Sequence, residues 1–127
     1  MNKVVLDASA VLALLNCEPG HEVVEKQLAN GVISAVNLSE VVTVLTELGI
    51  SCEESAMITG ELIKEVVDFD HAQALLAAGL RKITKSHGLS LGDRACLALA
   101  KFKNLPVLTA DKAWHNISHG IKVLLIR

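Results

Sequence analysis

Aromatic side chains are almost missing from this chain. Its 127 residues include no Tyr, a single Trp and two Phe, so aromatic residues make up only 2%. Proteins that hold single-stranded nucleic acid by its bases stack those bases on several aromatic side chains. The composition therefore argues against an aromatic base-stacking platform.

Long hydrophobic runs and paired cysteines are missing too. Asp7 interrupts the apolar stretch near the N-terminus, so we interpret that stretch as a strand and a helix, not as a targeting or membrane segment. Cys17, Cys52 and Cys96 are an odd number, show no C-x-x-C spacing and lie in apolar or helical contexts. These features predict reduced, buried thiols in a cytoplasmic protein with no membrane partner.

Charge is nearly balanced in total but is unevenly distributed. The formal net charge is −2, and hydrophobic residues make up 51% of the chain, as expected of one globular domain over residues 1–127. Up to Asp70, 3 Lys and Arg stand against 12 Asp and Glu; from His71 onward the numbers are 9 and 2. The halves thus carry −9 and +7. The basic half suits contact with a polyanion, or the two halves attract each other within the fold.

Short apolar segments alternate with helical patterns along the chain. Strands are predicted over residues 4–6, 32–35, 66–69, 106–109 and 121–126. Helices are predicted over residues 9–15, 21–28, 37–48, 52–65, 71–87 and 91–104, with a short one around Trp114. This alternation predicts an α/β fold with a parallel sheet of about five strands flanked by helices.

Capping residues and apolar faces are expected at several helices. Asn37 is predicted to cap its helix, and Ser90 is predicted to form a capping box with Asp93. The helix over 52–65 is predicted to turn Met57 inward, together with Ile58 and Leu62. Leu91 is predicted to lie on the buried face of the last long helix.

Acidic residues follow the predicted strands. Asp7 comes directly after the first strand and Asp111 after the fourth, and Glu40 lies near the start of the helix after the second strand. The carboxyl ends of parallel strands share one edge of the sheet, so these three acids are expected at the same edge. Asp93 begins a helix that follows another helix, so this rule does not place it.

Two interpretations of these acids stay open. Each can cap a helix or turn locally, which contributes about 1 kcal/mol. If they gather, two carboxylates about 5 Å apart repel by roughly 3 kcal/mol at an effective dielectric near 20, which favours uptake of protons or cations. Four oxygen donors without Cys or His suit Mg²⁺ or Mn²⁺ better than zinc.

The ordered motifs around these acids resemble a known family. The matching stretches are residues 6–10 (LDASA), 35–42 (AVNLSEVV), 88–100 and 108–111 (LTAD). In this order they resemble PIN-domain proteins, specifically the VapC-type ribonuclease toxins of bacterial toxin–antitoxin pairs. The resemblance implies a PIN-like three-layer α/β fold.

The resemblance also implies a site and partners. The residues that match the family's catalytic, metal-holding acids are Asp7, Glu40, Asp93 and Asp111. Ser9, Asn37 and Thr109 match small polar positions that orient the carboxylates or a bound water. The implied activity is a Mg²⁺-dependent endoribonuclease, with Mn²⁺ able to substitute. The implied partners are an RNA substrate, a VapB-like antitoxin and a second copy of the chain.

Two further interpretations come from the residues themselves. Arg94 is next to Asp93 at a helix start, where the helix dipole disfavours a cation, so we predict that it contacts substrate phosphate. The alternative function is a non-catalytic α/β protein-interaction domain with an acidic pocket. The helix over 52–65 favours it, because surplus apolar surface often marks an interface. Metal-dependent cleavage distinguishes the two functions.

Overall fold

The fold is built on a parallel sheet of five strands. The computed structural model describes residues 2–116 and 120–127. The strand order is β3-β2-β1-β4-β5, and every neighbouring pair is parallel. The strands are β1 (Val4–Leu6), β2 (Gly31–Ser34), β3 (Glu65–Val67), β4 (Val107–Thr109) and β5 (Val123–Leu125). The predicted parallel α/β class is confirmed.

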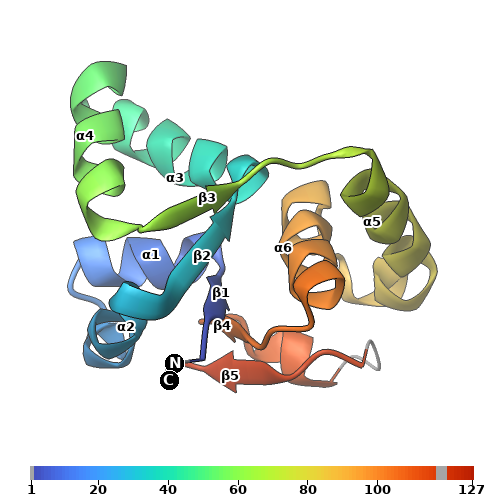
Figure 1. Ribbon diagram of the computed structural model, residues 1–127. Coiled ribbons are helices and arrows are strands. Elements are labelled where there is room, and N and C mark those ends of the chain that lie inside the picture. Colours follow the sequence, from blue (N-terminus) through green and yellow to red (C-terminus); the bar gives the residue numbers. More distant parts are fainter. Residues whose placement is uncertain (1, 117–119) are drawn as a thin grey trace.

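Helices cover both faces of this sheet. They are α1 (Ala8–Leu15), α2 (His21–Gln27), α3 (Ala35–Glu47), α4 (Cys52–Leu62), α5 (His71–Thr84) and α6 (Leu91–Lys103). Three short 3₁₀ helices are η1 (Leu28–Asn30), η2 (Lys85–His87) and η3 (Lys112–Asn116). In Figure 1, α1 to α4 lie on one side of the sheet, and α5 and α6 lie on the other. None of the helices described is both long and apolar enough to span a bilayer.

Two hydrophobic cores follow from the alternation of side chains along the strands. Val4 and Leu6 of β1 point into one core with α1, α2 and α3, whereas Val5 points into the other with α5 and α6. Trp114 of η3 is fully buried in the second core. Helix α6 is buried from Ala95 to Ala100, as expected of a helix that is apolar on most of its surface.

The direction of α6 decides where Asp93 lies. The helix leads directly into β4, and it packs on β1, β2 and β4. A helix that returns the chain to the amino end of a parallel strand begins at the carboxyl edge of the sheet. Asp93 therefore lies at the edge where Asp7 also lies.

The start of α3 differs from the prediction. The predicted Asn37 cap is wrong: α3 begins at Ala35, and the Val36 N–H donates to Ser34 Oγ at 3.2 Å. The chain passes from β2 into α3 without an intervening loop, so the last strand residue serves as the cap. Asn37 lies inside the first turn, fully buried and available for another role.

Other predicted boundaries shift as well, most clearly between α4 and β3. Helix α4 ends at Leu62, before the predicted end at residue 65, and β3 starts at Glu65, before the predicted 66–69 strand. Pairing with β2 sets these limits, because Val32 is opposite Glu65 in the parallel register. The pairing partner is a tertiary feature that the local pattern does not contain.

Two side chains that were predicted to be buried are exposed. Met57 is 64% exposed, because the buried residues of α4 are Ser55 and Thr59, whose small side chains let α4 approach α3 closely. Leu91 is 56% exposed at the first position of α6, where the helix end projects past the core.

The predicted burial of all three thiols is only partly correct. Cys96 is buried in α6, whereas Cys17 and Cys52 are exposed. Cys17 follows the end of α1 with a positive φ of 52°, and Cys52 is the first residue of α4. Both lie at helix ends, outside the two cores.

Candidate functional site

Asp7 is held by two hydroxyl groups at the carboxyl end of β1. It occupies the N-cap position of α1, yet its side chain accepts no capping hydrogen bond. Instead Ser9 Oγ donates to Asp7 Oδ2 at 2.5 Å, and Thr109 Oγ1 donates to the same oxygen at 2.9 Å. Asp7 is only 4% exposed. The local capping interpretation is thus wrong for Asp7, whose carboxylate is oriented by Ser9 and Thr109.

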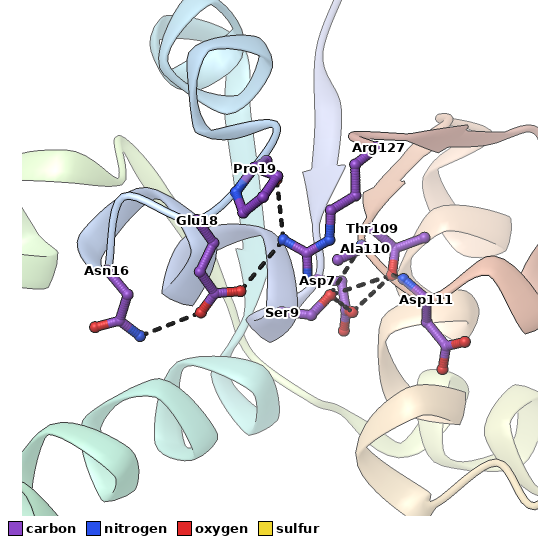
Figure 2. A network of polar contacts seen from close by, with 9 residues as sticks. All are labelled: Asp7, Ser9, Asn16, Glu18, Pro19, Thr109, Ala110, Asp111 and Arg127. Atoms are coloured by element: carbon purple, nitrogen blue, oxygen red, sulfur yellow. Dashed lines mark hydrogen bonds and ion pairs between the residues drawn. The ribbon is translucent and has the colours of Figure 1, made fainter.

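The same hydroxyls tie Asp7 to the loop after β4. Ser9 Oγ accepts from the Ala110 N–H, and Thr109 Oγ1 accepts from the Asp111 N–H, both at 3.0 Å. Figure 2 shows this network, in which the carboxylates of Asp7 and Asp111 point to the same side. A hydroxyl has one proton to donate, and here both protons go to Asp7 Oδ2. The network therefore favours the ionised form of Asp7.

Burial and charge act on Asp7 in the opposite direction. Burial raises the pKa of Asp7 from 3.8 to about 6, against the hydrogen bonds from Ser9 and Thr109, which lower it. The negative charges of Asp93 and Glu40 raise this pKa further. The structure thus brings three of the four predicted acids close enough to affect one another electrostatically.

Glu40 is positioned by Asn37 and by Gly92. Asn37 Nδ2 donates to Glu40 Oε1 at 2.8 Å and to the Gly92 carbonyl at 2.9 Å. These bonds join the start of α3 to the start of α6. The Glu40 carboxylate lies directly against Gly92, the second residue of α6.

Asp93 has a capping role as well as its place near the other acids. The Ser90 N–H donates to Asp93 Oδ2 at 3.0 Å, and the Asp93 N–H donates to Ser90 Oγ at 3.1 Å. The predicted capping box is therefore confirmed. It uses one carboxylate oxygen of a half-buried side chain, and the other oxygen accepts no hydrogen bond from the described residues.

Asp111 lies at the rim of this group. Its Oδ1 accepts from the Ala113 N–H at 2.9 Å, which stabilises the turn into η3 as the local interpretation predicts. Asp111 is joined to Asp7 through Thr109, whose hydroxyl accepts from the Asp111 N–H and donates to Asp7.

The chemistry of these donors fits a hard divalent cation. Within residues 2–116 and 120–127, no three Asp, Glu, His or Cys side chains converge tightly enough to enclose a metal ion. One oxygen each of Glu40, Asp93 and Asp111 is bonded to a neighbouring N–H group. The remaining donors are carboxylate oxygens around a buried acid, which is the ligand chemistry that Mg²⁺ and Mn²⁺ prefer.

A family model settles the relationship of this fold to known proteins. The model of the PIN domain matches residues 4–120. The chain belongs to the PIN domain family. The resemblance to PIN-domain toxins indicated by the sequence motifs is confirmed, and PIN domains are generally nucleases.

Solved structures share the fold at low sequence identity. A DNA-bound VapBC from Salmonella typhimurium is 21% identical with a TM-score of 0.74, and all of both chains is covered. A toxin–antitoxin complex from Klebsiella pneumoniae is 18% identical, with a TM-score of 0.74 and 98% of each chain covered. VapC20 of Mycobacterium tuberculosis is 16% identical, with a TM-score of 0.69 and coverage of 91% of this chain and 97% of that chain. No curated protein matches in sequence.

Cys96 is a residue of this PIN-domain site that the sequence analysis missed. It is fully buried. Burial raises the pKa of its thiol well above the usual range, and the charges of Asp7, Asp93 and Glu40 raise it further. The thiol is therefore a protonated, uncharged neighbour of the acids. Its position three residues after Asp93 was the available signal, since helix residues three apart share a face.

Arg94 does not point freely into the site of this PIN domain. Its Nη1 donates to the Ala77 carbonyl of α5 at 3.1 Å, and its Nε is buried without a partner among the described residues. This geometry favours a role in joining α6 to α5 over the predicted phosphate contact. Lys112, next to Asp111 in the sequence, is exposed.

Proposed function

We propose that this PIN domain is a divalent-metal-dependent endoribonuclease that acts as the toxin of a toxin–antitoxin pair. The catalytic, metal-holding residues of this proposal are Asp7, Glu40, Asp93 and Asp111, with Mg²⁺ as the ion and Mn²⁺ able to substitute. One observation carries the proposal: Asp7 is buried and is held by Ser9 and Thr109 at the carboxyl end of β1, close enough to Asp93 and Glu40 for their charges to add to the effect of burial in raising its pKa. Such a group gains stability when a cation balances its charge.

The chain's own residues prepare this site. Ser9 and Thr109 both donate to Asp7 Oδ2. The other carboxylate oxygen, Oδ1, accepts no hydrogen bond from the described residues. Asn37 holds Glu40 against the start of α6. A bound ion would supply Lewis-acid chemistry, lowering the pKa of a water and balancing charge on a phosphodiester. Preorganised carboxylates lower the cost of assembling such a site.

RNA is the substrate class that the family resemblance supports. The VapC20 structure is described as that of a toxin that cleaves the sarcin–ricin loop, an RNA target, and its chain shares this fold. Lys112 is exposed beside Asp111 and is the side chain that we assign to substrate phosphate.

Exposed apolar residues support partner binding by the same chain. Leu91 is 56% exposed at the first position of α6, the helix whose first turn also carries Asp93. Leu48 and Met57 are 65% and 64% exposed near the end of α3 and in α4. We assign these surfaces to a VapB-like antitoxin and to a second copy of this chain.

RNA cleavage by matched preparations tests the proposed activity. Wild type and Asp93→Asn, purified side by side, are incubated with end-labelled RNAs, including transfer and ribosomal RNA fragments, in Mg²⁺ or Mn²⁺. We expect wild type to cleave and both EDTA and Asp93→Asn to abolish cleavage, because the substitution keeps the shape of the side chain and removes its charge.

The controls separate the two candidate functions. Equal cleavage by wild type and Asp93→Asn would assign the activity to a contaminant or another site. No cleavage of any RNA, with binding of a partner retained, would favour the non-catalytic interaction domain.

A further inference from the structure

Gly92 has an ordinary helical backbone, but there is no space beside it for a side chain. It is the second residue of α6 and is buried. A Cβ at this position would lie 2.6 Å from Glu40 Cδ and 2.9 Å from Glu40 Oε1, with Glu40 Oε2 closer still. At this position in the first turn of α6, the absence of a side chain leaves space that another group occupies. That group is the carboxylate of Glu40.

Other helical glycines of this chain lack such a neighbour. A Cβ added to Gly60 of α4 or Gly79 of α5 would meet nothing within 4 Å. Those two positions accept a methyl group without any steric conflict. They provide matched controls for the change from glycine to alanine in a helix.

Asn37 fixes the group that occupies the space at Gly92. Its amide nitrogen donates to Glu40 Oε1 at 2.8 Å and to the Gly92 carbonyl at 2.9 Å. Asn37 is fully buried, so few alternative rotamers are open to it. The Glu40 carboxylate is therefore tied to the backbone at the same residue that leaves room for it.

We propose that Gly92 is a positioning residue for the metal site: its missing side chain lets Glu40 share that site with Asp7 and Asp93. This inference rests on the proposed function. Ordinary contact with a Cβ begins at 3.4 Å, so alanine would displace the Glu40 carboxyl carbon by about 0.8 Å or force α6 to move. Metal–ligand distances tolerate about 0.2 Å. Alanine at residue 92 would thus separate Glu40 from the other ligands.

Manganese binding measures this effect without an activity assay. Free Mn²⁺ is followed by its electron paramagnetic resonance signal during titration of wild type, Gly92→Ala and Gly79→Ala. We expect Gly92→Ala to weaken Mn²⁺ binding about 10- to 100-fold, as for other changes that misplace a ligand. Gly79→Ala is expected to bind like wild type. Equal binding by wild type and Gly92→Ala would overturn the positioning role.

A double-mutant cycle separates positioning from general damage to the fold. If Gly92 acts through Glu40, then Gly92→Ala has no further effect on Mn²⁺ affinity in the Glu40→Ala background. Further weakening in that background would overturn the proposal. If Gly92→Ala alone does not fold, Glu40→Ala is expected to restore folding by removing the clashing group. Failure of both chains to fold would also overturn it.

The same titration distinguishes failure of this inference from failure of the proposed function. Wild type that binds no Mn²⁺ would overturn the metal-dependent nuclease and, with it, the positioning role. Wild type that binds Mn²⁺ while Gly92→Ala binds equally well would overturn the positioning role alone.

Discussion

The two edges of the sheet carry opposite charge. Asp7, Glu40 and Asp93 gather at the carboxyl edge. The amino edge has hollows of about 250 to 480 Å³ whose lining includes the lysines Lys3, Lys64 and Lys122. The helix macrodipole favours acids where helices begin and cations where they end. Helix α6 follows this rule, with Asp93 in its first turn and Lys101 and Lys103 in its last turn.

The two edges also differ in how far their charged groups are buried. The Lys3 side chain is 55% exposed and forms an ion pair with Glu65 at 2.8 Å. Asp7 is 4% exposed and has acids for neighbours. Water screens the lysines, whereas Asp7 is buried and feels the negative charges of the half-buried Glu40 and Asp93. The comparison shows what marks the candidate site. It is a buried acid without a balancing positive charge, and a patch of exposed charges is a weaker sign.

Removing a charge from each edge gives the largest expected contrast. Asp7→Asn is expected to lower RNA cleavage about 1000-fold, since loss of a metal ligand removes several kcal/mol of transition-state stabilisation. Lys3→Gln combined with Lys122→Gln is expected to leave the rate within about twofold of wild type at 0.15 M salt. Initial rates on one labelled RNA measure both. A comparable loss from the lysine variant would place substrate binding at the amino edge.

The pH dependence of stability tests the burial of Asp7. Because its pKa is about 6 when folded and 3.8 when unfolded, the folded chain binds the proton more tightly. Stability from this group is therefore complete below pH 3.8 and is lost as pH rises through 6, by about 3 kcal/mol. Urea unfolding in EDTA from pH 4 to 7 should show this loss in wild type relative to Asp7→Asn. Parallel curves for the two chains would contradict it.

Mn²⁺ is expected to restore part of the stability that wild type loses as pH rises. This gain should depend on the acids at the carboxyl edge and not on the lysines at the amino edge. At a Mn²⁺ concentration 100 times its dissociation constant, wild type is expected to gain about 2.7 kcal/mol. Asp93→Asn should gain much less, whereas the lysine variant should gain as much as wild type. Urea unfolding at pH 7.5 with matched ionic strength measures the gain. An equal gain in all three chains would indicate binding away from the acids.

The smallest effect is expected at the amino edge. The side chains of the Lys3–Glu65 ion pair are 55% and 37% exposed. The coupling energy between them should therefore be below about 1 kcal/mol and should vanish in high salt. A double-mutant cycle of Lys3→Ala and Glu65→Ala measures it. A coupling of several kcal/mol would mean that this edge is as sensitive as the other.

Much of the site was accessible from sequence, because strand ends are local features. Asp7 and Asp111 follow short apolar runs, and in a parallel sheet those ends share an edge. Asp93 was accessible too: a helix that leads straight into a parallel strand must begin at the carboxyl edge, a rule that the sequence analysis did not apply. The Ser90–Asp93 capping box was correctly predicted because it depends on residues three apart.

Other features depended on contacts between distant segments. Asn37 matched a capping pattern locally, yet it bonds to Gly92, 55 residues away. Arg94 bonds through its guanidinium to the Ala77 carbonyl of α5, a contact that its place beside Asp93 does not predict, and its phosphate contact stays a prediction. Met57 fits an inward-facing pattern, but α4 turns Ser55 and Thr59 inward. Each of these contacts depends on how the helices pack.

The sequence by itself determined the parallel α/β class, the order of strands and helices, and the edge to which Asp7 and Asp111 belong, since these follow from hydrophobic period and chain direction. Only the tertiary structure decided that Asp7 is buried, that Asp93 and Glu40 act on its pKa, and that Glu40 rests in the space left by Gly92. Burial and electrostatic coupling depend on distances between elements, and those distances exist only once the helices have packed.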